Sequence, residues 1–576
     1  MLLVLSGALS PRSAARRISR AVSASAASER SSGLSGWPAA FDNSLLRELR
    51  GEPPGAPPLQ SRQVHGAHYT RVRPTVTAPQ PVLVIWSSAV AECLGLLPDD
   101  CESKEFLAVF SGSPPASYEC WATAYGASFT GQYGGQRGDG RAISIGQYAG
   151  YEIQLKGAGV TPYSRQFDGR AVLRSSIREF LASEAMAALR VPTTRSLCVV
   201  TTGEEVVRQW YDERGAQRIQ AEPGAVGTRV ATSFLRFGQM ELFYQRRELD
   251  LLRELAEHAL KREFPHLQDA MLSRNLVRMF DEICRRQATL IAEWLRVGYC
   301  QGNMNSDNSA LSGITLDYGP FAFMEKFQPH YNPWVGGGVP YSFARQPQAA
   351  AANLAGLSSA FAELLDVVGK EEGQSTAEIN SNINDVRNSV SSTFVDCFHA
   401  AHDCNCRAKL GLVEWDSEAE ELWNDLLRLM STRSGANGVD FTNLFRALSV
   451  PLSSLADSIS ITLKPAAFQD IAHWPQEHKE EWEAWMKRYR SKLELEERPS
   501  DERLAEMEST NPRYILRNWM AVEAYEAAAS GNYDVLREIH NLLSNPYNDQ
   551  GSEADERWGG LTPQWARDRP GVAFMS

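Results

Sequence analysis

The segment QGNMNSDNSALSGITLDYGPF, which runs from Gln301 to Phe321, places two aspartates, Asp307 and Asp317, ten residues apart. Asn308 directly follows the first aspartate, Tyr318-Gly319 follow the second, and the residues between are almost all small or apolar. Carboxylate and amide oxygens suit Mg²⁺, which takes few protein ligands and keeps several waters. A pair of Asx-capped turns is the structural alternative, because Asp and Asn side chains also hydrogen-bond to nearby backbone.

Length and composition are typical of an ordinary globular protein. The chain has 576 residues, which is enough for two or more lobes that each have a sizeable core. The apolar fraction is 43% and the charged fraction 22%, and no uninterrupted apolar run approaches the roughly 18 residues of a membrane span. The formal net charge of −12 argues against a nonspecific nucleic-acid-binding protein, which normally has a basic surface.

The nine cysteines form no CxxC motif and no evident disulfide framework. One cluster, CFHAAHDCNC, brings Cys397, His399, His402, Cys404 and Cys406 close in sequence. Its spacings are not those of a usual zinc site, although a metal there remains an alternative. We expect all nine to be ordinary thiols of a reducing compartment.

The N-terminal residues differ in composition from the rest of the chain. Residues 1–30 are rich in Ser, Ala and Arg, and they contain no acidic residue before Glu29. This composition predicts a mitochondrial targeting peptide. A secretory signal would place its positive charge before the apolar run, whereas here the charge follows it; a disordered tail is the remaining alternative. The Pro-rich residues 31–65 are predicted to form an extended arm.

Hydrophobic periodicity divides the remainder into a β-rich and a helical part. Residues 141–145 and 151–155 alternate with period two around a short Gly-containing turn, which predicts a β-hairpin. Residues 175–189 and 275–298 have apolar positions at helical spacing. We therefore predict an α+β, bilobal fold with a β-rich N-lobe, a helical C-lobe, a C-terminal tail and a cleft between the lobes; the ranges are 66–240, 241–560 and 561–576.

Several residues of the β-rich part are candidates for binding phosphate. Glycines just before a strand let backbone N–H groups approach phosphates, and a strand lysine can neutralise them. The candidates are Gly138, Gly140 and Arg141 of GQRGDGR, Lys156, the Asp168-Gly169 turn, and Arg229 and Arg236. Plain turns, an exposed lysine and surface ion pairs are the alternatives for these features.

The segment that contains Asp307 and Asp317 also resembles two motifs of protein kinases. Asp317-Tyr318-Gly319 resembles the metal-binding D-F-G turn. Asp307-Asn308 resembles the catalytic base and the metal-binding Asn, although kinases place four residues between those two. A β-rich lobe, a helical lobe and polar motifs at their junction suggest an enzyme with a cleft between the lobes.

The longer motifs identify a family. LKGAGVTPYSRQFDGRAVLRSSIREFL, VPTTR, FLRFG, NSDN, LDYGPF and NPRYILRNWMAVEAYEAA resemble the selenoprotein O family of protein adenylyltransferases, over roughly Gly66 to Tyr547. The resemblance implies a protein-kinase-like fold that binds ATP in a reversed orientation and transfers AMP to Ser, Thr or Tyr of proteins. It also implies a mitochondrial location for eukaryotic members, which agrees with the predicted targeting peptide.

The resemblance also implies roles for individual residues. Asp307 is the proton acceptor, and Asn308 and Asp317 are the Mg²⁺ ligands. The nucleotide-binding set comprises Gly138, Gly140, Arg141, Lys156, Asp168, Gly169, Arg229, Arg236 and Asp317. Glu179 is the helix glutamate that pairs with the lysine, whereas the helical period places Glu184, not Glu179, within the apolar stripe; we favour Glu179.

Some positions depart from the family pattern. Gln301-Gly302 replaces a common His-Gly, and the C-terminal end RDRPGVAFMS lacks the terminal selenocysteine or cysteine. The cysteine expected after Asp317 is also missing, which puts redox control in doubt but leaves every predicted catalytic position filled.

We expect an ATP- and Mg²⁺-dependent protein adenylyltransferase. The alternatives are a kinase-like phosphotransferase and a nucleotide-binding pseudoenzyme scaffold.

Overall fold

The computed structural model describes residues 33–57, 59–211, 216–267, 269–431, 438–455 and 459–568. The predicted targeting peptide, residues 1–30, lies outside them, as do residues 569–576 of the predicted tail. Within the predicted arm, short helices α2 (Trp37–Ala40) and α3 (Ser44–Glu48) bring Trp37 and Leu45 into the core, and irregular chain follows.

An antiparallel sheet forms the centre of the N-lobe. Its strands pair in the order β1, β3, β6, β7, β10, β9 and β2, and β8 pairs with β10. The bounds are β1 Tyr69–Arg71, β2 Val82–Trp86, β3 Trp121–Thr123, β6 Ala142–Tyr148, β7 Tyr151–Lys156, β8 Ala171–Val172, β9 Arg195–Tyr211 and β10 Gln217–Ala231. A separate hairpin, β4 (Gly126–Phe129) and β5 (Gln132–Gln136), extends toward the C-lobe.

The predicted hairpin is confirmed by β6 and β7. These strands pair from Ala142 opposite Lys156 to Tyr148 opposite Tyr151, with a register shift between Ser144 and Gly146. The two turn residues, Ala149 and Gly150, have φ angles of 51° and 83°. Positive φ at both central positions is the geometry of a type I′ turn, whose twist matches that of the strands. This hairpin brings Lys156 to the end of a central strand.

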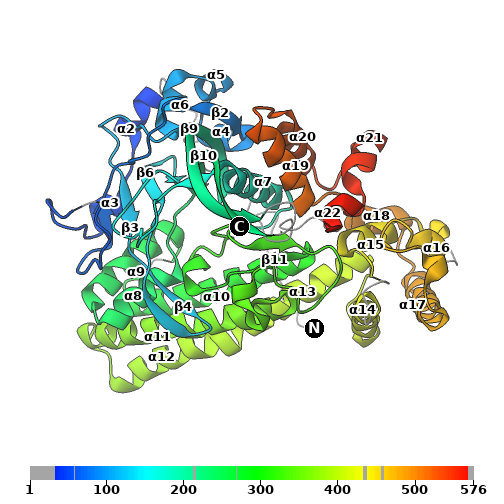
Figure 1. Cartoon of the computed structure of the whole chain (residues 1–576). Coiled ribbons are helices and arrows are strands. Elements are labelled where there is room, and N and C mark those ends of the chain that lie inside the picture. The colour runs from blue at the N-terminus through cyan, green and yellow to red at the C-terminus, as the bar shows by residue number, and fades with distance from the viewer. Residues whose placement is uncertain are drawn as a thin grey trace.

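Helices form the C-lobe and also flank the sheet (Figure 1). The N-lobe helices are α4 Ser88–Cys93, α5 Pro98–Cys101, α6 Lys104–Phe110 and α7 Leu173–Ala188. The longer C-lobe helices are α8 Phe237–Arg246, α9 Leu249–Glu263, α10 Leu272–Arg296, α11 Gln346–Glu371, α12 Thr376–Ser391, α13 Thr393–Leu410, α14 Ser417–Met430, α15 Phe441–Leu448, α17 Gln476–Leu495 and α18 Ser500–Thr510. The helices predicted at 175–189 and 275–298 are thus present as α7 and α10.

Two helices late in the described residues return to the N-lobe. Helices α19 (Asn518–Ala529) and α20 (Asp534–Leu543) pack on α7, on the side of that helix away from the sheet (Figure 1). The rings of Phe180 and His540 lie 5.1 Å apart at this contact. The bilobal, kinase-like fold is therefore confirmed, but residues 518–543 of the predicted C-lobe range support α7 in the N-lobe.

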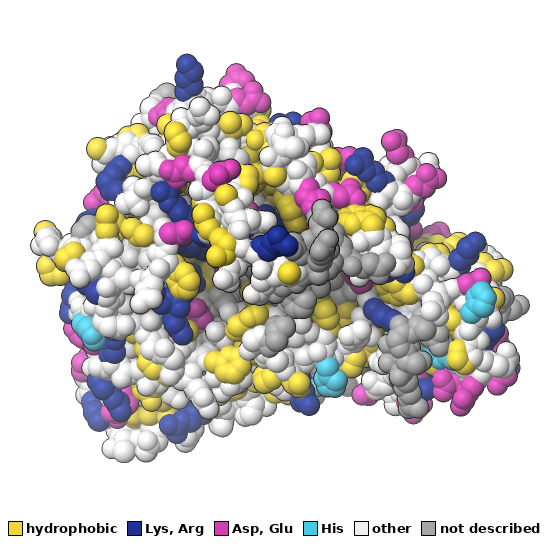
Figure 2. Space-filling view, in the orientation of Figure 1, with side chains coloured by type: hydrophobic (Ala, Val, Ile, Leu, Met, Phe, Trp, Pro, Cys, Tyr) yellow, Lys and Arg dark blue, Asp and Glu magenta, His cyan; other side chains and the backbone are white. Residues whose placement is uncertain are grey.

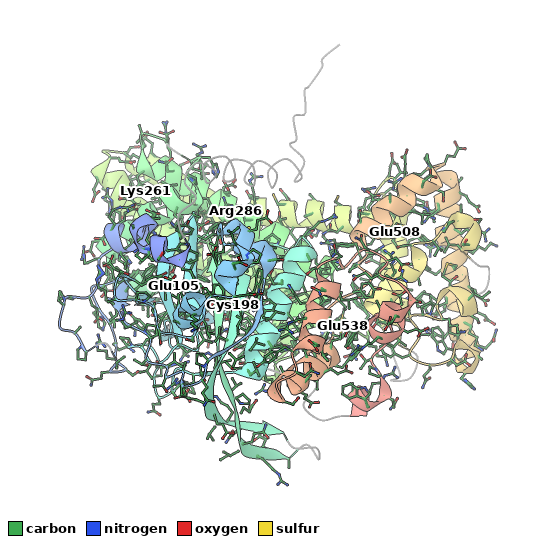
Figure 3. The ribbon with its side chains drawn as sticks, turned by 90° about the horizontal axis from the view of Figure 1, so that it is seen from above. Glu105, Cys198, Lys261, Arg286, Glu508 and Glu538 are labelled. Atoms are coloured by element: carbon green, nitrogen blue, oxygen red, sulfur yellow. The ribbon has the colours of Figure 1, made fainter. Side chains whose placement is uncertain are left out.

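Strands β9 and β10 are longer than the rest of the sheet requires. Seen from above, their paired ends project beyond the body of the molecule, and Cys198 lies near the base of the projection (Figure 3). The side chains of Val207 and Ile219 are 61% and 72% exposed, so the projecting part has little core of its own.

One helical stretch within the described residues, Phe343–Glu371, is long and apolar enough to cross a membrane. Of its most apolar window, 56% is buried inside the molecule. Leu354, Leu357 and Phe361 are fully buried in the main core cluster. Its apolar character is therefore accounted for by packing in the C-lobe.

Candidate active site

Lys156 lies at the centre of the candidate site. Its Nζ is 2.7 Å from Oε2 of Glu179 on α7 and 2.7 Å from Oδ1 of Asp317. These contacts connect strand β7, helix α7 and the turn that contains Asp317, which are far apart in the sequence. Glu179 is therefore confirmed as the partner of the lysine. Glu184 has a different role, because its carboxylate pairs with Arg195 at 2.7 Å.

Arg229 brings a second cation to Asp317. Its Nη1 donates to Oδ1 of Asp317 at 3.0 Å, and its Nη2 donates to Gln154. The residue is 5% exposed, and its Nε is buried without a hydrogen-bond partner. A buried guanidinium with an unsatisfied N–H carries a free-energy cost that an anionic ligand would remove.

The two cations determine the charge of Asp317. Burial alone would raise the pKa of this carboxyl, but Lys156 and Arg229 outweigh burial and hold the pKa well below its usual range. The two cations therefore favour the ionised carboxylate, which is the form that binds a metal ion.

Arg236 holds the segment that carries Asp307. Its Nη1 donates to the main-chain oxygen of Asp307 at 2.9 Å, and its guanidinium lies over the ring of Tyr125 at 4.2 Å. Its Nη2 is 3.7 Å from Oδ1 of Asp139 but is buried without a hydrogen bond. Arg236 therefore connects the β-rich lobe to the predicted catalytic segment and retains one unsatisfied N–H.

The side chain of Asp307 has the character of a proton acceptor. Oδ1 is buried and has no hydrogen-bond partner. Burial raises the pKa of this carboxyl, and the nearby Arg236 opposes that rise. A carboxylate with an unused acceptor and a raised pKa is suited to remove a proton from a bound hydroxyl.

Asn308 lies beside it in the short 3₁₀ helix η2, Ser306–Asn308. Its Nδ2 donates to the main-chain oxygen of Asn303 at 3.0 Å, which fixes the amide and leaves Oδ1 as an oxygen ligand. Together with the ionised Asp317 this is a hard-oxygen pair, which fits Mg²⁺ because that ion uses few protein ligands.

Packing explains the glycines of the predicted phosphate loop. A Cβ at Gly138 would come within 2.4 Å of the Tyr163 ring, and one at Gly140 within 2.9 Å of the Tyr163 main-chain oxygen. Gly138 also has a φ of 122°, which L side chains rarely adopt. These contacts account for glycine at both positions without a ligand, so their nucleotide role stays a prediction.

The Asp168-Gly169 turn is held by the projecting hairpin. Arg208 of β9 donates to both carboxylate oxygens of Asp168, at 2.8 and 2.9 Å. Gly169 has a φ of 68°, and a Cβ there would lie 2.2 Å from the backbone of Gly159. Asp168 is exposed and already has a bidentate partner, so a nucleotide contact by this carboxylate would compete with Arg208.

A cavity lies beside these charged groups. It is lined by Arg141, Lys156, Glu179, Arg229 and the Tyr318-Gly319-Pro320 turn, among others, and encloses about 190 Å³. In the space-filling view, Lys and Arg side chains gather beside the hollow between the β-rich and helical parts (Figure 2). Arg141 is exposed just before β6 and lines the same cavity as Lys156 and Arg229. Its role in nucleotide binding stays a prediction.

The structure accommodates Gln301, which stands where family members commonly have histidine. Its Nε2 donates to the main-chain oxygen of Asp317 at 3.1 Å, and its Oε1 accepts a hydrogen bond from the Tyr299 hydroxyl at 2.5 Å. On the other side of the turn, Arg178 donates to the main-chain oxygens of Gly319 and Phe321. The position of the Asp317 turn is therefore fixed at both ends.

The cysteine-histidine cluster does not assemble into a metal site. Within the described residues, no three His, Cys, Asp or Glu side chains are grouped so that they could hold a metal ion. His402 instead stacks on Phe398, with ring centroids 5.5 Å apart, and all nine cysteines are free thiols.

Sequence reasoning missed several residues of the site. Asp139 is 2% exposed and accepts hydrogen bonds from the backbone and hydroxyl of Thr123, at 2.9 and 2.6 Å. Gln154 and Tyr125, which contact the two arginines, were also missed. Asp139 lies inside the GQRGDGR motif, where its position between two glycines was the only sequence feature that could have identified it. No sequence pattern indicated a role for Gln154 or Tyr125.

Comparison with known proteins gives consistent matches along the chain. A family model described as "Protein adenylyltransferase SelO" matches residues 59–544. The protein nucleotidyltransferase YdiU of Azoarcus sp. (strain BH72) is 39% identical over 550 residues, which cover 94% of this chain and 99% of the relative. The YdiU of Aromatoleum aromaticum is 40% identical over 550 residues, which cover 93% of this chain and 98% of the relative. The YdiU of Xanthomonas campestris pv. campestris (strain B100) is 39% identical over 547 residues, with 93% and 98% covered.

The fold and the site define a kinase-like nucleotide-dependent transferase. A strand lysine pairs with a helix glutamate and with the aspartate of the Asp-Tyr-Gly turn, and the lysine, the glutamate and Tyr318-Gly319 of that turn line a charged cavity. The extent of the family match identifies the particular group: the chain belongs to the protein adenylyltransferase SelO family. It is therefore an enzyme of the protein nucleotidyltransferase class, as the resemblance had implied.

Proposed function

We propose that this enzyme uses MgATP to transfer AMP to serine, threonine or tyrosine hydroxyls of proteins. The observation that carries the proposal is the ion-paired cluster of Lys156, Glu179, Arg229 and the ionised Asp317. The first three of these residues line one cavity, as do Tyr318 and Gly319, which follow Asp317. Asp307, whose Oδ1 lacks a hydrogen-bond partner, supplies the proton acceptor that the transfer requires.

The proposed step breaks one bond and forms one. The acceptor hydroxyl oxygen bonds to the α-phosphorus, and the bond from that phosphorus to the α,β-bridging oxygen breaks, so pyrophosphate leaves with that electron pair. Asp307 takes the hydroxyl proton. Lys156 and Arg229 compensate the negative charge that develops on the phosphates. Asn308 and Asp317 would hold Mg²⁺, which, when bound, neutralises phosphate charge.

The distribution of cations supports attack at the α-phosphorus. Arg229 and Arg236 are buried on the β-rich side, and each keeps an N–H without a hydrogen-bond partner. With Arg141 and Lys156 they would attract the β- and γ-phosphates deep into the site. The α-phosphorus would then lie toward Asp307 and the acceptor hydroxyl.

Two other functions use the same parts differently. A phosphotransferase would bind ATP in the opposite orientation and transfer the γ-phosphoryl group. A pseudoenzyme scaffold would bind nucleotide without transfer, but binding alone gives no reason to keep the unpartnered carboxylate oxygen of Asp307 buried beside the cations.

Mass spectrometry tests the proposed reaction. The purified chain is incubated with MgATP and a mitochondrial extract, and peptides are searched for an added AMP on Ser, Thr or Tyr. The Asp307→Ala variant, which keeps the cation cluster, is the matched control. We expect AMP-modified peptides with the wild type and far fewer with the variant; equal numbers would contradict the proposal.

We also propose a mitochondrial location, which rests on the Arg-rich, acid-poor composition of residues 1–30. A fluorescent protein fused after residue 30 should enter mitochondria, and the same fusion without residues 1–30 should not. Diffuse fluorescence of both fusions would contradict the proposed location.

A further inference from the structure

The hairpin β4–β5 of the N-lobe is attached to the catalytic segment of the C-lobe. The main-chain N–H of Ser128 on β4 donates to the hydroxyl of Ser306 at 2.8 Å. Two residues further, the N–H of Thr130 donates to the Tyr341 hydroxyl at 3.3 Å, and that hydroxyl donates to Oδ1 of Asn305 at 2.9 Å. The hairpin therefore contacts Ser306 directly and Asn305 through Tyr341, and these two residues immediately precede Asp307.

Glu241 joins the two sides of this contact. One of its carboxylate oxygens, Oε2, accepts hydrogen bonds from the hydroxyls of both Ser128, at 3.0 Å, and Ser306. The three residues are 4%, 6% and 0% exposed, respectively, so water does not compete for these bonds. Burial raises the pKa of Glu241, and the two serine hydroxyls oppose that rise.

Helix α8 carries both groups that hold the catalytic segment. Arg236, which caps the start of α8, binds the main-chain oxygen of Asp307, and Glu241 lies little more than one helical turn later. The fit between α8 and the hairpin is tight, because a Cβ at Gly238 would lie 2.2 Å from the Gly126 main-chain oxygen and 3.3 Å from the Asp307 Cα. Figure 1 shows α8 and β4 side by side.

We propose that Glu241 is a positioning residue that couples closure of the β4–β5 hairpin to the placement of Asp307. This inference rests on the proposed function, since it assigns Asp307 the role of proton acceptor there. When the hairpin closes, Ser128 completes the hydrogen-bonded set around Glu241 and fixes Ser306. Asp307 is then held between Ser306 and the arginine that binds its main-chain oxygen. Closure of the hairpin and correct placement of the Asp307 carboxylate therefore occur together.

Kinetics of Glu241 variants test the coupling. In Glu241→Ala, we expect kcat for AMP transfer to fall about 10- to 100-fold, the size expected for a misplaced catalytic group, with a smaller change in MgATP affinity. Glu241→Gln keeps an acceptor oxygen at the same place and should recover most of the activity. Glu263→Ala is the matched control, because Glu263 is also a buried carboxylate that accepts from a hydroxyl, that of Thr232 at 3.1 Å.

Hydrogen exchange separates this inference from the proposed reaction. In the full-length chain, Glu241→Ala should speed exchange in residues 126–136 and 304–310 together, and Glu263→Ala should not. Ser128→Ala, a small change that keeps the fold, should speed exchange at 304–310 although it lies in the other lobe. Absence of AMP transfer by the wild type would contradict the proposed function alone. Unchanged exchange at 304–310 in Glu241→Ala and Ser128→Ala, or an unchanged kcat in Glu241→Ala, would overturn the coupling.

Discussion

At the scale of single residues, the two aspartates of the quoted segment differ because their surroundings differ. Asp317 contacts two cations that keep it ionised, whereas Asp307 has a buried oxygen without a partner and a raised pKa. Two similar carboxyl groups with opposite pKa shifts are a common arrangement for a metal or charge ligand beside a proton acceptor.

Substitution should separate these two roles. Asp317→Ala should abolish Mg²⁺-supported transfer, because it removes a metal ligand and the partner of Lys156 and Arg229. Asp307→Ala should leave MgATP binding largely intact and slow transfer by roughly 10²–10⁴-fold, as expected for loss of a general base. Titration calorimetry with MgATP and initial rates would measure both effects. Equal, mild losses in the two variants would mean that the roles are misassigned.

The raised pKa of Asp307 predicts a pH dependence of the rate. A general base acts only when deprotonated, so kcat should rise with pH through the folded-state pKa and level off above it. Because burial raises that pKa, the inflection should lie above the ordinary aspartate value of about 4. Initial rates across the acidic and neutral range measure it, and Asp307→Asn should remove the inflection. A rate that is flat or falls with pH in the wild type would be inconsistent with this role.

At the scale of elements, helix α7 shows what the sequence predicts and what it does not. Its existence, the β6–β7 hairpin and α10 follow from hydrophobic periodicity. The partner of Lys156 does not, because α7 is covered by the sheet on one side and by α19 and α20 on the other. Buried residues therefore occur all around this helix, and a single apolar stripe could not distinguish Glu179 from Glu184.

Long-range contacts limited the rest of the prediction in the same way. The phosphate candidates Lys156, Arg141 and Arg229 were found because strands and motifs are local features. Glu241, Gln154 and Tyr125 were missed, since each acts through a residue far away in the sequence. The packing of α19 and α20 on α7 was missed for the same reason, as no local pattern encodes it.

The two glutamates of α7 should respond differently to substitution. Glu184→Ala leaves Arg195 without its partner and should lower the free energy of unfolding by on the order of 3 kcal/mol. Glu179→Ala should reduce transfer strongly, because Lys156 loses the contact that orients it toward the cavity. Urea denaturation and initial rates measure the two effects. The assignment fails if Glu184→Ala is the variant that loses activity while keeping its stability.

At the scale of the whole molecule, the chain joins a β-rich lobe and a helical lobe across the site, and its last long helices return to support α7. Of the thiols, Cys198 lines the candidate cavity, but it is buried, and burial raises its pKa far above the usual range of a thiol. Cys300, the nearest in sequence to the catalytic segment, is buried, and burial raises its pKa far above the usual range of a thiol. Cys93 and Cys404 are exposed, and neither is among the residues of the site.

Activity should therefore be insensitive to mild oxidant and to dithiol reductant. The resemblance implies a cysteine shortly after Asp317, whereas the next cysteine in this sequence is Cys397. Rates of AMP transfer after each treatment measure this, and a Cys404→Ser variant controls for modification of the exposed thiol. A large, reversible activation by reductant would be evidence against it and would direct attention to Cys300 or the pair Cys404 and Cys406.

Which phosphorus of ATP is attacked is the central question, because lysine, base and metal ligands alone serve either reaction. The enzyme with Mg²⁺ is incubated with protein substrate and ATP that is labelled at the α- or at the γ-phosphate. We predict that label enters protein from the α position only, with release of pyrophosphate. Incorporation only from the γ position would contradict the proposed orientation of ATP and show that the enzyme transfers phosphate.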